Sequence, residues 1–545
     1  MLIQPATQPP RRAPVPPAAA PLAVTPWSFG QRLALRIAVI FFGIMALPNS
    51  LRWYRDLLAL DWTSLHYRDL YDIARFGSGL TLFGNRLFGN ELMGYAPWLI
   101  TALVAVVGGL LWTGLARWRG REVRNYNDLY YWLRVVVRYR AGIGIIGFGF
   151  TKVLPTQLPY PSLGLMNANF GDLTAQKLYW LSIGIVPWYE VFAGVVEVVA
   201  GILLFFRKTT FLGAVLLFGA LADIVWVNLA YDGGVHVYSS YFVLLAGFLL
   251  WKDLPAVWNL LVRERYTVPY TYHPALTQPW QRWGRYTLKA LTLWLFVVVL
   301  FYLQVVNFIY DPYKQPAQAG VRTLRGNYAV TDFRINGQSL PYDPTDTTRW
   351  RQATFENWST LTFSVNKPAR LDLSNGGGAP MRDLNRTFEV TGVAGGQRVF
   401  YYDADTVARV LYLQDKVRIE GPRADAPGAG NPAESGTRRP GPTPSARARA
   451  ERDWIPASAR AVIGDEFSKV DPLVQTTRRR RGLIEESKPA ERDRLVLHYD
   501  TTDGRRVILR GQTGPHDSIE VVLDRVERPY ALSPNSLPAG RYNDR

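Results

Sequence analysis

The sequence predicts an α-helical membrane bundle followed by a small, mainly antiparallel β domain. Nearly all of the long apolar runs lie in the first 310 of the 545 residues. The rest of the chain is mostly polar and holds short runs in which apolar residues alternate. Aromatic residues make up 13% of the chain, with 18 tryptophans, and Trp and Tyr gather at membrane interfaces. Together these observations favour a membrane part and a separate β domain over one globular fold.

The apolar runs predict about seven membrane spans. A bilayer core about 30 Å thick requires roughly 20 mostly apolar helical residues. Arg36 interrupts the first candidate span, the sixth is short, and the fourth is long enough to be tilted, or kinked near Pro187. The candidate spans are 32–49, 95–116, 129–151, 178–206, 210–230, 236–252 and 287–309.

Composition and apolar patterning divide the chain into seven regions. In order, they are a Pro- and Ala-rich disordered tail (1–26), two leading spans with a long exterior loop (27–127), a four-helix core (128–255), a cytoplasmic loop with the last span (256–310), the first part of an exported β domain (311–420), an insert that cannot bury a core and is expected to be disordered (421–452), and the second part of the β domain (453–545). The exterior segment 50–94 spaces apolar residues three and four apart, which predicts short amphipathic helices.

The charges of the loops predict the orientation. Arginine-rich ARWRGREVRN follows the second span, Arg207 and Lys208 follow the fourth, and further cations follow the sixth. All three loops lie on one side if there are seven spans, and by the positive-inside rule that side is the cytoplasm. We therefore expect a multi-pass protein of a bacterial inner membrane, with a cytoplasmic N-terminus and a periplasmic C-terminal domain.

Strand patterns fill the C-terminal region. DTTDGRR (500–506) contains an Asp-Gly pair, which is typical of a hairpin turn. The predicted strands are 328–336, 361–366, 387–391, 398–402, 408–413, 495–499, 506–509 and 518–523. A small antiparallel sheet or barrel is expected.

Composition excludes several kinds of chemistry. The chain has no cysteine, which rules out disulfides, thiolate nucleophiles and cysteine-ligated metal centres. The five histidines are scattered, so no metal site is predicted. The net charge of +18 does not indicate nucleic acid here, because the arginines flank apolar spans. The lipid bilayer is the first expected partner.

Charged residues inside the spans are the candidate site. Glu190 and Glu197 are seven residues apart, so two helical turns place both carboxylates on nearly one face. The third span supplies Arg138 and, at its outer end, Lys152. Charges at this depth are costly unless they are paired or hydrated. Two interpretations stay open: Arg138–Glu197 and Lys152–Glu190 pairs that fix helix register, or a site for protons, anions or a polar headgroup. Glu197, expected near the bilayer centre, is the preferred functional residue, and further candidate ligand-binding residues are Asp223, Asn228 and His236.

Two motifs stand out in residues 131–253. They are LRVVVRYRAGIGIIGFGFTK, with an early Arg, glycines and a closing Lys, and VVEVVAGILLFFRKTT, with a Glu, small residues and a basic turn. In these motifs the segment resembles the DoxX family of four-helix membrane proteins. The resemblance implies a membrane-embedded four-helix core. Some members are linked to quinone reduction, as a subunit of thiosulfate:quinone oxidoreductase, or to thiol-redox and oxidative-stress complexes. Carried over by position, the candidates are Arg138, Lys152 and Glu197.

Three functions follow as alternatives. In the first, the protein binds a quinone or a similar small molecule as the membrane subunit of a redox or stress-response assembly, with Glu197 relaying a proton or hydrogen-bonding a quinone carbonyl and Arg138 holding Glu197 in its charged form. A redox partner protein would then supply any thiol chemistry. The second is a proton-coupled transporter whose cavity is lined by Glu190, Glu197 and Asp223. The third is an assembly protein that presents its β domain to an exported partner. Because no haem or flavin motif is visible, the chain is at most a non-catalytic or quinone-site subunit of an oxidoreductase.

Overall fold

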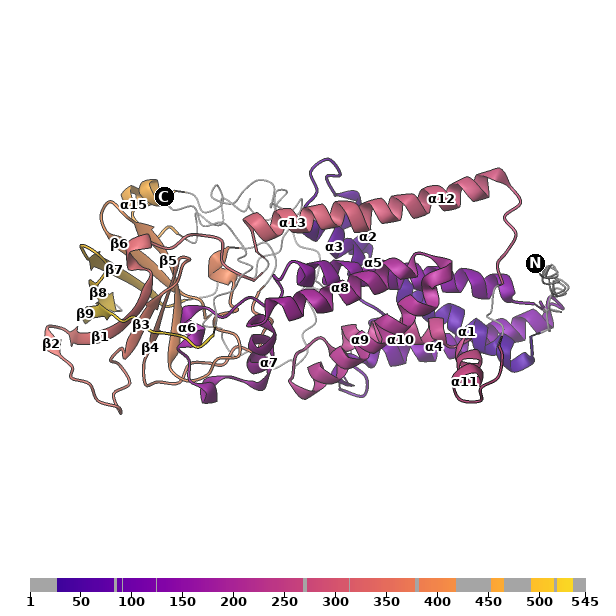
Figure 1. The fold of residues 1–545 in the computed structure, drawn as a ribbon, viewed down its shortest axis with the longest axis horizontal. Helices are drawn as coiled ribbons and strands as arrows, with labels where there is room; N and C mark the ends of the chain where they lie inside the picture. The colour runs from indigo at the N-terminus through magenta and orange to yellow at the C-terminus, as the bar shows by residue number, and fades with distance from the viewer. Residues whose placement is uncertain are drawn as a thin grey trace, which may run out of the picture.

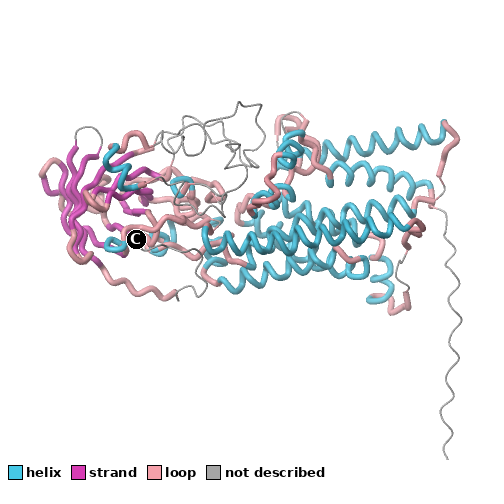
Figure 2. Tube along the Cα trace, turned by 90° about the horizontal axis from the view of Figure 1, so that it is seen from above, coloured by secondary structure: helices cyan, strands magenta, loops and turns pink. Residues whose placement is uncertain are grey.

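The molecule is elongated, with a helical bundle at one end and a β-barrel at the other (Figure 1). The computed structural model describes residues 27–82, 86–90, 92–123, 125–267, 272–312, 314–377, 382–417, 452–464, 492–513 and 517–532. The predicted tail 1–26 and residues 421–451 of the predicted insert lie outside these ranges. The view from above separates the two parts in the same way (Figure 2).

Five helical segments are long and apolar enough to cross a membrane. They are α1 (Phe29–Ala46), α4 (Ala96–Trp118), α8 (Pro187–Leu204), α9 (Thr210–Ala230) with the short turn η4 (Arg207–Thr209) before it, and the continuous α12, η5 and α13 (Pro279–Leu293, Trp294–Val299, Leu300–Tyr310). A sixth becomes possible if α10 (His236–Leu250) and α11 (Leu254–Leu261), bent by 72°, form one span.

The third predicted span is the helix α5 (Asn127–Val153). It is 27 residues long, but three arginines and a lysine make it too polar to count as a span by length and hydropathy alone. The fourth predicted span is divided, because α7 (Ala175–Gly184) ends before α8 begins at Pro187, where the sequence predicted a kink. The structure thus contains the helices of all seven predicted spans, of which five, or six with the bent pair, qualify by composition.

Arg36 illustrates how the bundle accommodates a charge within an apolar helix. This residue of α1 is fully buried. Its guanidinium donates to the hydroxyl of Thr113 at 2.7 Å and to the hydroxyl of Tyr126 at 2.7 Å. A buried charge requires such partners, so the arginine that interrupts the first apolar run joins α1 to α4 and to the start of α5.

The loop between α1 and α4 enters the bundle. As predicted, it contains short helices, α2 (Leu51–Leu58) and α3 (Tyr67–Ala74). α2 buries none of its residues, whereas α3 buries Tyr67, Leu70 and Tyr71. The ring of Tyr71 lies 5.1 Å from that of Phe148 on α5, measured between centroids. α3 is therefore part of the bundle core and not a surface helix.

The C-terminal part is a closed antiparallel barrel of eight strands. In order around the barrel these are β1 (Gly326–Ile335), β3 (Gln352–Phe355), β4 (Thr360–Ser364), β5 (Gln397–Asp405), β6 (Val410–Asp415), β7 (Arg494–Asp500), β8 (Arg506–Thr513) and β9 (Asp517–Arg525). Pairing of β1 with both β3 and β9 closes the barrel, and β2 (Gln338–Ser339) pairs with the end of β1. Side chains fill its interior, as in other small barrels.

One predicted strand is absent, and one strand of the barrel, β3, was not predicted. Residues 387–391 form a turn, in which the N–H groups of Val390 and Thr391 both bond to the carbonyl of Thr387. Its apolar residues are buried because the segment packs between the bundle and the barrel. The strand pattern reflected this burial, which does not come from a sheet. The short β3 went unpredicted because four residues carry too little alternation. The predicted Asp-Gly turn does connect β7 to β8, with Gly504 at φ +75°.

Candidate functional site

An ion pair joins α5 to α8 inside the bundle. The ammonium of Lys152 donates to Oε1 of Glu197. The Glu197 side chain is 2% exposed and that of Lys152 is 14% exposed. The second carboxylate oxygen of Glu197, Oε2, is buried and has no hydrogen-bond partner. A buried carboxylate with an unused acceptor is a costly arrangement unless something else donates to it.

Glycines bring the two helices together at this level. A Cβ on Gly149 of α5 would lie 3.0 Å from the carbonyl oxygen of Gly194, and one on Gly194 of α8 would lie 2.5 Å from the backbone nitrogen of Val153. Such close approach of helix backbones is the usual reason for small residues at membrane helix contacts. Gly149 and Gly194 therefore set the distance across which Lys152 reaches Glu197.

The predicted pairing of charges is corrected by the structure. Lys152 pairs with Glu197, and not with Glu190. Arg138, expected to pair with Glu197, donates instead to the hydroxyl of Thr210 at 3.2 Å, at the first residue of α9. The reason is an offset between the helices: α8 begins beyond the C-terminal end of α5, so Glu197, near the middle of α8, stands opposite the last turn of α5.

Glu190 lies beyond that last turn, beneath the loop that follows α5. It is 1% exposed, and its Oε1 accepts a hydrogen bond from the backbone N–H of Leu158 at 3.1 Å. Its other carboxylate oxygen has no hydrogen-bond partner. Glu190 and Glu197 do face the same side of α8, as their spacing predicted, and each leaves one buried oxygen available.

Three other predicted residues lie elsewhere. Asp223 is exposed on α9 and does not point into the bundle interior. Asn228 is buried, and its amide donates to the carbonyl of Ile224 at 2.7 Å near the end of α9. His236 contacts the carbonyl oxygen of Met93 at 2.9 Å. The structure therefore brings Glu190, Glu197 and Lys152 together, and leaves Asp223, Asn228 and His236 outside that group.

Tyr179 on α7 was not predicted but stands near two of the acids. Burial, followed by the nearby carboxylate of Asp223 and more weakly that of Glu197, raises the pKa of Tyr179. Its ring stacks on Tyr231 at a centroid distance of 5.3 Å. A tyrosine among apolar and aromatic residues gives no sequence signal of its own, so only the position of α7 across the bundle end could identify it.

A second group of charges lies where the bundle meets the barrel. The ammonium of Lys314 stands 4.5 Å from the ring centroid of Trp180 on α7. Burial, partly offset by Glu190, lowers the pKa of Lys314 to about 8. Lys177 donates to the carbonyl of Phe388, and burial followed by repulsion from Lys314 lowers the pKa of Lys177 well below its usual value. Neither lysine stands in a pattern from which its burial could be predicted.

The barrel closes this junction with its own acids. The carboxylate of Glu356 accepts hydrogen bonds from the N–H groups of Leu163, at 3.1 Å, and Gly164, at 2.7 Å, which begin the short helix α6 (Leu163–Met166). Burial and the neighbouring Glu389 raise the pKa of Glu356 to about 8. A cavity of about 10 Å³, room for roughly one water molecule, remains between the bundle loop and the barrel beside Ser162, Lys314 and Glu389.

Within the described residues no three His, Asp or Glu side chains gather in a way that would hold a metal ion. The Lys152–Glu197 pair offers the chemistry of an ammonium beside a carboxylate: three N–H donors, two oxygen acceptors and a transferable proton. Such a pair hydrogen-bonds a carbonyl, a hydroxyl or an anion, and it needs no metal for this.

Comparison with known proteins gives one sequence relative to report. A segment of 94 residues is 35% identical to a Bacillus subtilis (strain 168) protein described as the uncharacterized protein YwoB. The match covers 16% of this chain and 61% of the relative, so the chain spans less than two thirds of that protein. No family model matches the chain, and no solved structure matches it.

Proposed function

We propose that the protein is a DoxX-like membrane protein that binds a quinone or a similar small lipophilic molecule at the Lys152–Glu197 pair, as the membrane subunit of a redox or stress-response assembly. The observation that carries the proposal is the buried, unpartnered Oε2 of Glu197 beside the ammonium of Lys152. A ligand hydroxyl donates to that oxygen, and a ligand carbonyl accepts from one of the remaining N–H groups of Lys152.

The surroundings of the pair suit a ligand that is mostly apolar. Residues 141–150 of α5 and, apart from Glu197, residues 191–204 of α8 are all glycine, aliphatic or phenylalanine. Binding sites for small molecules typically combine such an apolar wall with a few polar anchors. Bound quinone would supply the two-electron redox chemistry, while this chain supplies hydrogen bonds and a proton from or to Glu197. Any thiol that donates electrons would belong to a partner protein, because the chain has no cysteine.

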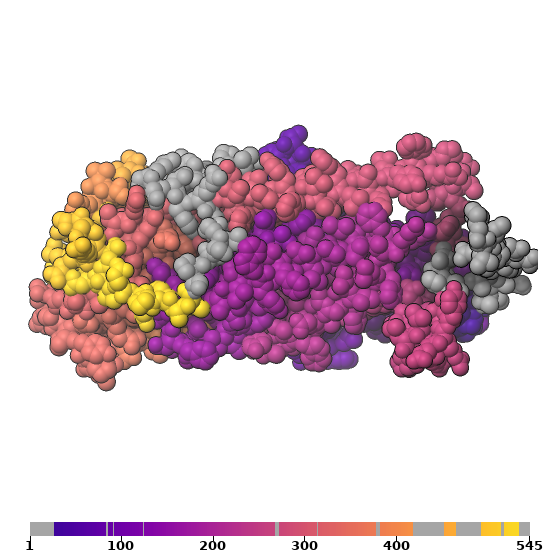
Figure 3. All heavy atoms as spheres, viewed as in Figure 1, coloured from indigo at the N-terminus to yellow at the C-terminus, as the bar shows by residue number. Residues whose placement is uncertain are grey.

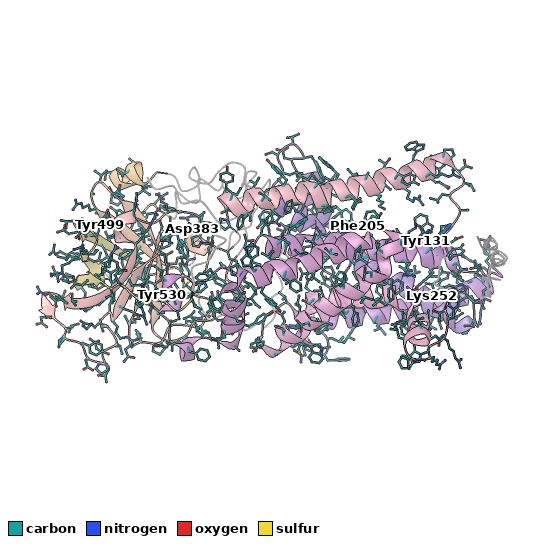
Figure 4. The ribbon with its side chains drawn as sticks, viewed as in Figure 1. Tyr131, Phe205, Lys252, Asp383, Tyr499 and Tyr530 are labelled. Atoms are coloured by element: carbon teal, nitrogen blue, oxygen red, sulfur yellow. The ribbon has the colours of Figure 1, made fainter. Side chains whose placement is uncertain are left out.

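We further propose that the barrel lies outside the cytoplasmic membrane and the N-terminus inside. Arg117, in the last turn of α4, stands over the ring of Phe29, and Lys252 stands over the ring of Trp27. Figure 4 labels Lys252 at the bundle end opposite the barrel. Cations thus gather at one end of the bundle and the barrel at the other. The positive-inside rule then supports a cytoplasmic location for the cationic end and a periplasmic barrel.

Of the other two functions, the assembly protein has specific support. The loop after α5 binds the barrel through the side chain of Asn167, whose Oδ1 accepts hydrogen bonds from Arg528 at 2.8 Å and Tyr530 at 2.9 Å. Together with Glu356 and Lys177, this holds the barrel firmly on the bundle, as a scaffold for a periplasmic partner requires. The transporter has less support, because Asp223, one of its three predicted cavity residues, is exposed.

Quinone binding tests the proposal. The purified full-length protein in detergent is titrated with a short-tailed benzoquinone and a naphthoquinone, and quenching of tryptophan fluorescence is recorded for wild type and Glu197→Gln. We expect saturable binding by the wild type and at least a tenfold weaker affinity for the variant, because a buried hydrogen-bonding partner is lost.

Asp253→Asn is the matched control. It removes the acid of another membrane-edge ion pair, Arg134–Asp253 at 3.2 Å, at the opposite end of α5. This variant should bind quinone like the wild type. Equal affinities for wild type and Glu197→Gln, or no saturable binding at all, would reject the proposal and leave the assembly function as the supported one.

A further inference from the structure

A cluster of cations lies at the end of α8 away from the barrel, which the proposed orientation places toward the cytoplasm. Arg138 of α5 is repelled by Arg134 and Arg207, and Lys289 of α12 is repelled by Arg138 and Arg285. Within the described part of the chain, neither Arg138 nor Lys289 forms an ion pair with a carboxylate, and the charged groups that act most strongly on them are other cations. We call Arg138, Arg207, Arg285 and Lys289 the basic cluster.

Arg138 differs from the arginine one helical turn before it. Arg134 forms an ion pair with Asp253. Within the described residues, the side chain of Arg138 donates a hydrogen bond only to the neutral hydroxyl of Thr210. Arg138 is 9% exposed, and its Nε is buried without a hydrogen-bond partner. A guanidinium so deeply placed normally has an anion to balance it. Arg138 therefore has both the charge and a free donor for an anionic ligand.

The walls around the cluster are apolar and aromatic. Lys289 stands 3.7 Å from the ring centroid of Phe206, and Arg138 lies 5.4 Å from that of Tyr139. Figure 4 marks Phe205 and Tyr131 on the part of the bundle that lies beneath α12 in that view. A ligand at this position contacts cations at one end and rings or aliphatic side chains along its length.

α12 leaves this side of the bundle accessible. None of its residues is buried, and Leu288 and Leu291 are 67% and 50% exposed. The space-filling view is open between α12 and the bundle toward the end away from the barrel (Figure 3). Acyl chains can lie along this apolar surface, while a headgroup reaches the basic cluster. Basic pockets between membrane helices on the cytoplasmic side are typical sites for anionic lipid headgroups.

We propose that the basic cluster binds the phosphate of an anionic phospholipid of the inner leaflet, with its acyl chains between α12 and the ends of α5 and α8. The shared chemistry, a phosphate on arginine and lysine, also fits free inorganic phosphate. The apolar surface beside the cluster favours the lipid. This site is separate from the Lys152–Glu197 pair, which lies toward the barrel end of α5.

The test is lipid binding to the delipidated full-length protein by native mass spectrometry. Phosphatidylglycerol and phosphatidylcholine are titrated against wild type, the double variant Arg138→Gln/Lys289→Gln, and the double variant Arg263→Gln/Arg265→Gln. The last removes two exposed cations that follow α11 and so changes the net charge equally. Each cation near a membrane surface changes affinity by roughly fivefold, so the first double variant should lose roughly 25-fold for phosphatidylglycerol.

The wild type and Arg263→Gln/Arg265→Gln should bind one phosphatidylglycerol molecule with high preference over phosphatidylcholine. Lys289→Gln alone and Arg138→Lys keep the test informative if the double variant does not fold: the first should lose roughly fivefold and the second little. Equal binding of both lipids, equal loss in the two double variants, or full displacement of phosphatidylglycerol by millimolar inorganic phosphate would each overturn the proposal.

Discussion

Glu197 in the bundle and Glu389 at the base of the barrel are both buried and both pair with a lysine. They differ in whether the second carboxylate oxygen has a hydrogen-bond partner. At the barrel, Oε1 of Glu389 accepts from the indole N–H of Trp358 and Oε2 accepts from Lys416, so both oxygens are used. In the bundle, only Oε1 of Glu197 has a partner. Lys416 is fully buried, whereas Lys152 is 14% exposed.

This difference separates a charge pair that holds a structure from one that is available to a ligand. A fully enclosed pair contributes mainly by avoiding the cost of an unpaired charge, and removing either partner is expensive. A pair with a free acceptor and a partly accessible ammonium loses less when one partner is neutralised. The same pair can gain a hydrogen bond when a ligand arrives. The predictions below test this distinction, beginning with the largest effect.

Glu389→Gln is expected to destabilise the protein by about 3–5 kcal/mol, because it leaves the ammonium of Lys416 buried without its counter-ion. Thermal unfolding of the full-length protein, followed by tryptophan fluorescence, measures this change. Glu520→Gln is the control, since it breaks only the surface ion pairs of Glu520 with Arg510 and Arg334 on the barrel and should cost less than about 1 kcal/mol. Equal effects of the two substitutions would contradict the prediction.

Glu356 should make the junction sensitive to pH. Burial raises the pKa of Glu356 to about 8 in the folded protein, above its ordinary value of 4.5. The folded state therefore holds this proton where the unfolded state releases it, so stability is full below pH 4.5 and falls by a few kcal/mol as pH rises to about 8.

Glu356→Gln is expected to flatten this slope while lowering absolute stability, because Gln keeps only one of the two acceptor oxygens that bind the N–H groups of Leu163 and Gly164. Unfolding temperatures of wild type and variant at several pH values between 5 and 8 provide the measurement. Parallel pH dependences of the two proteins would show that Glu356 is already ionised in the folded state.

Gly194→Ala tests the close contact on which the Lys152–Glu197 pair depends. The added Cβ would lie 2.5 Å from the backbone nitrogen of Val153, so α8 must move away from α5, at a cost of about 1–3 kcal/mol. Gly114→Ala on α4 is the matched control, because a Cβ there meets nothing within 4 Å. Thermal unfolding of both variants measures the difference. An unchanged unfolding temperature for Gly194→Ala would contradict the close packing of α5 on α8.

Glu197→Gln is expected to have the smallest effect on stability, about 1 kcal/mol or less, because the partly exposed ammonium of Lys152 can find water or lipid headgroups. The unfolding temperature measures this effect beside that of Glu389→Gln. A loss for Glu197→Gln as large as that for Glu389→Gln would make the bundle pair a structural one and remove the contrast between the two glutamates.

Much of the architecture follows from sequence patterns, because apolar length and strand alternation are local properties. The helices of the seven predicted spans are present, and seven of the eight predicted strands overlap strands of the barrel. The exception, 387–391, is buried by contact between distant segments. Local alternation cannot distinguish that kind of burial from burial within a sheet.

The candidate site was predicted only in part, for a related reason. Helical spacing placed Glu190 and Glu197 on one face, but the pairing depends on how far α8 slides past α5. That offset follows from the glycine contacts and from the break before Pro187. Because of it, Glu197 pairs with Lys152 and not with Arg138. Lys314 lies close enough to affect Glu190 only because the barrel packs on the end of the bundle. Such a contact between segments distant in sequence cannot be predicted from local patterns.

Photoaffinity labelling with an azidoquinone tests the central claim most directly. The full-length protein is labelled in detergent and the modified peptides are identified by mass spectrometry, with and without excess unlabelled quinone. The site at Lys152 and Glu197 predicts competable label confined to the last turns of α5 and the first half of α8, and its loss in Glu197→Gln. Label on the barrel, or label that excess quinone fails to displace, would contradict the assignment of a quinone site to this pair.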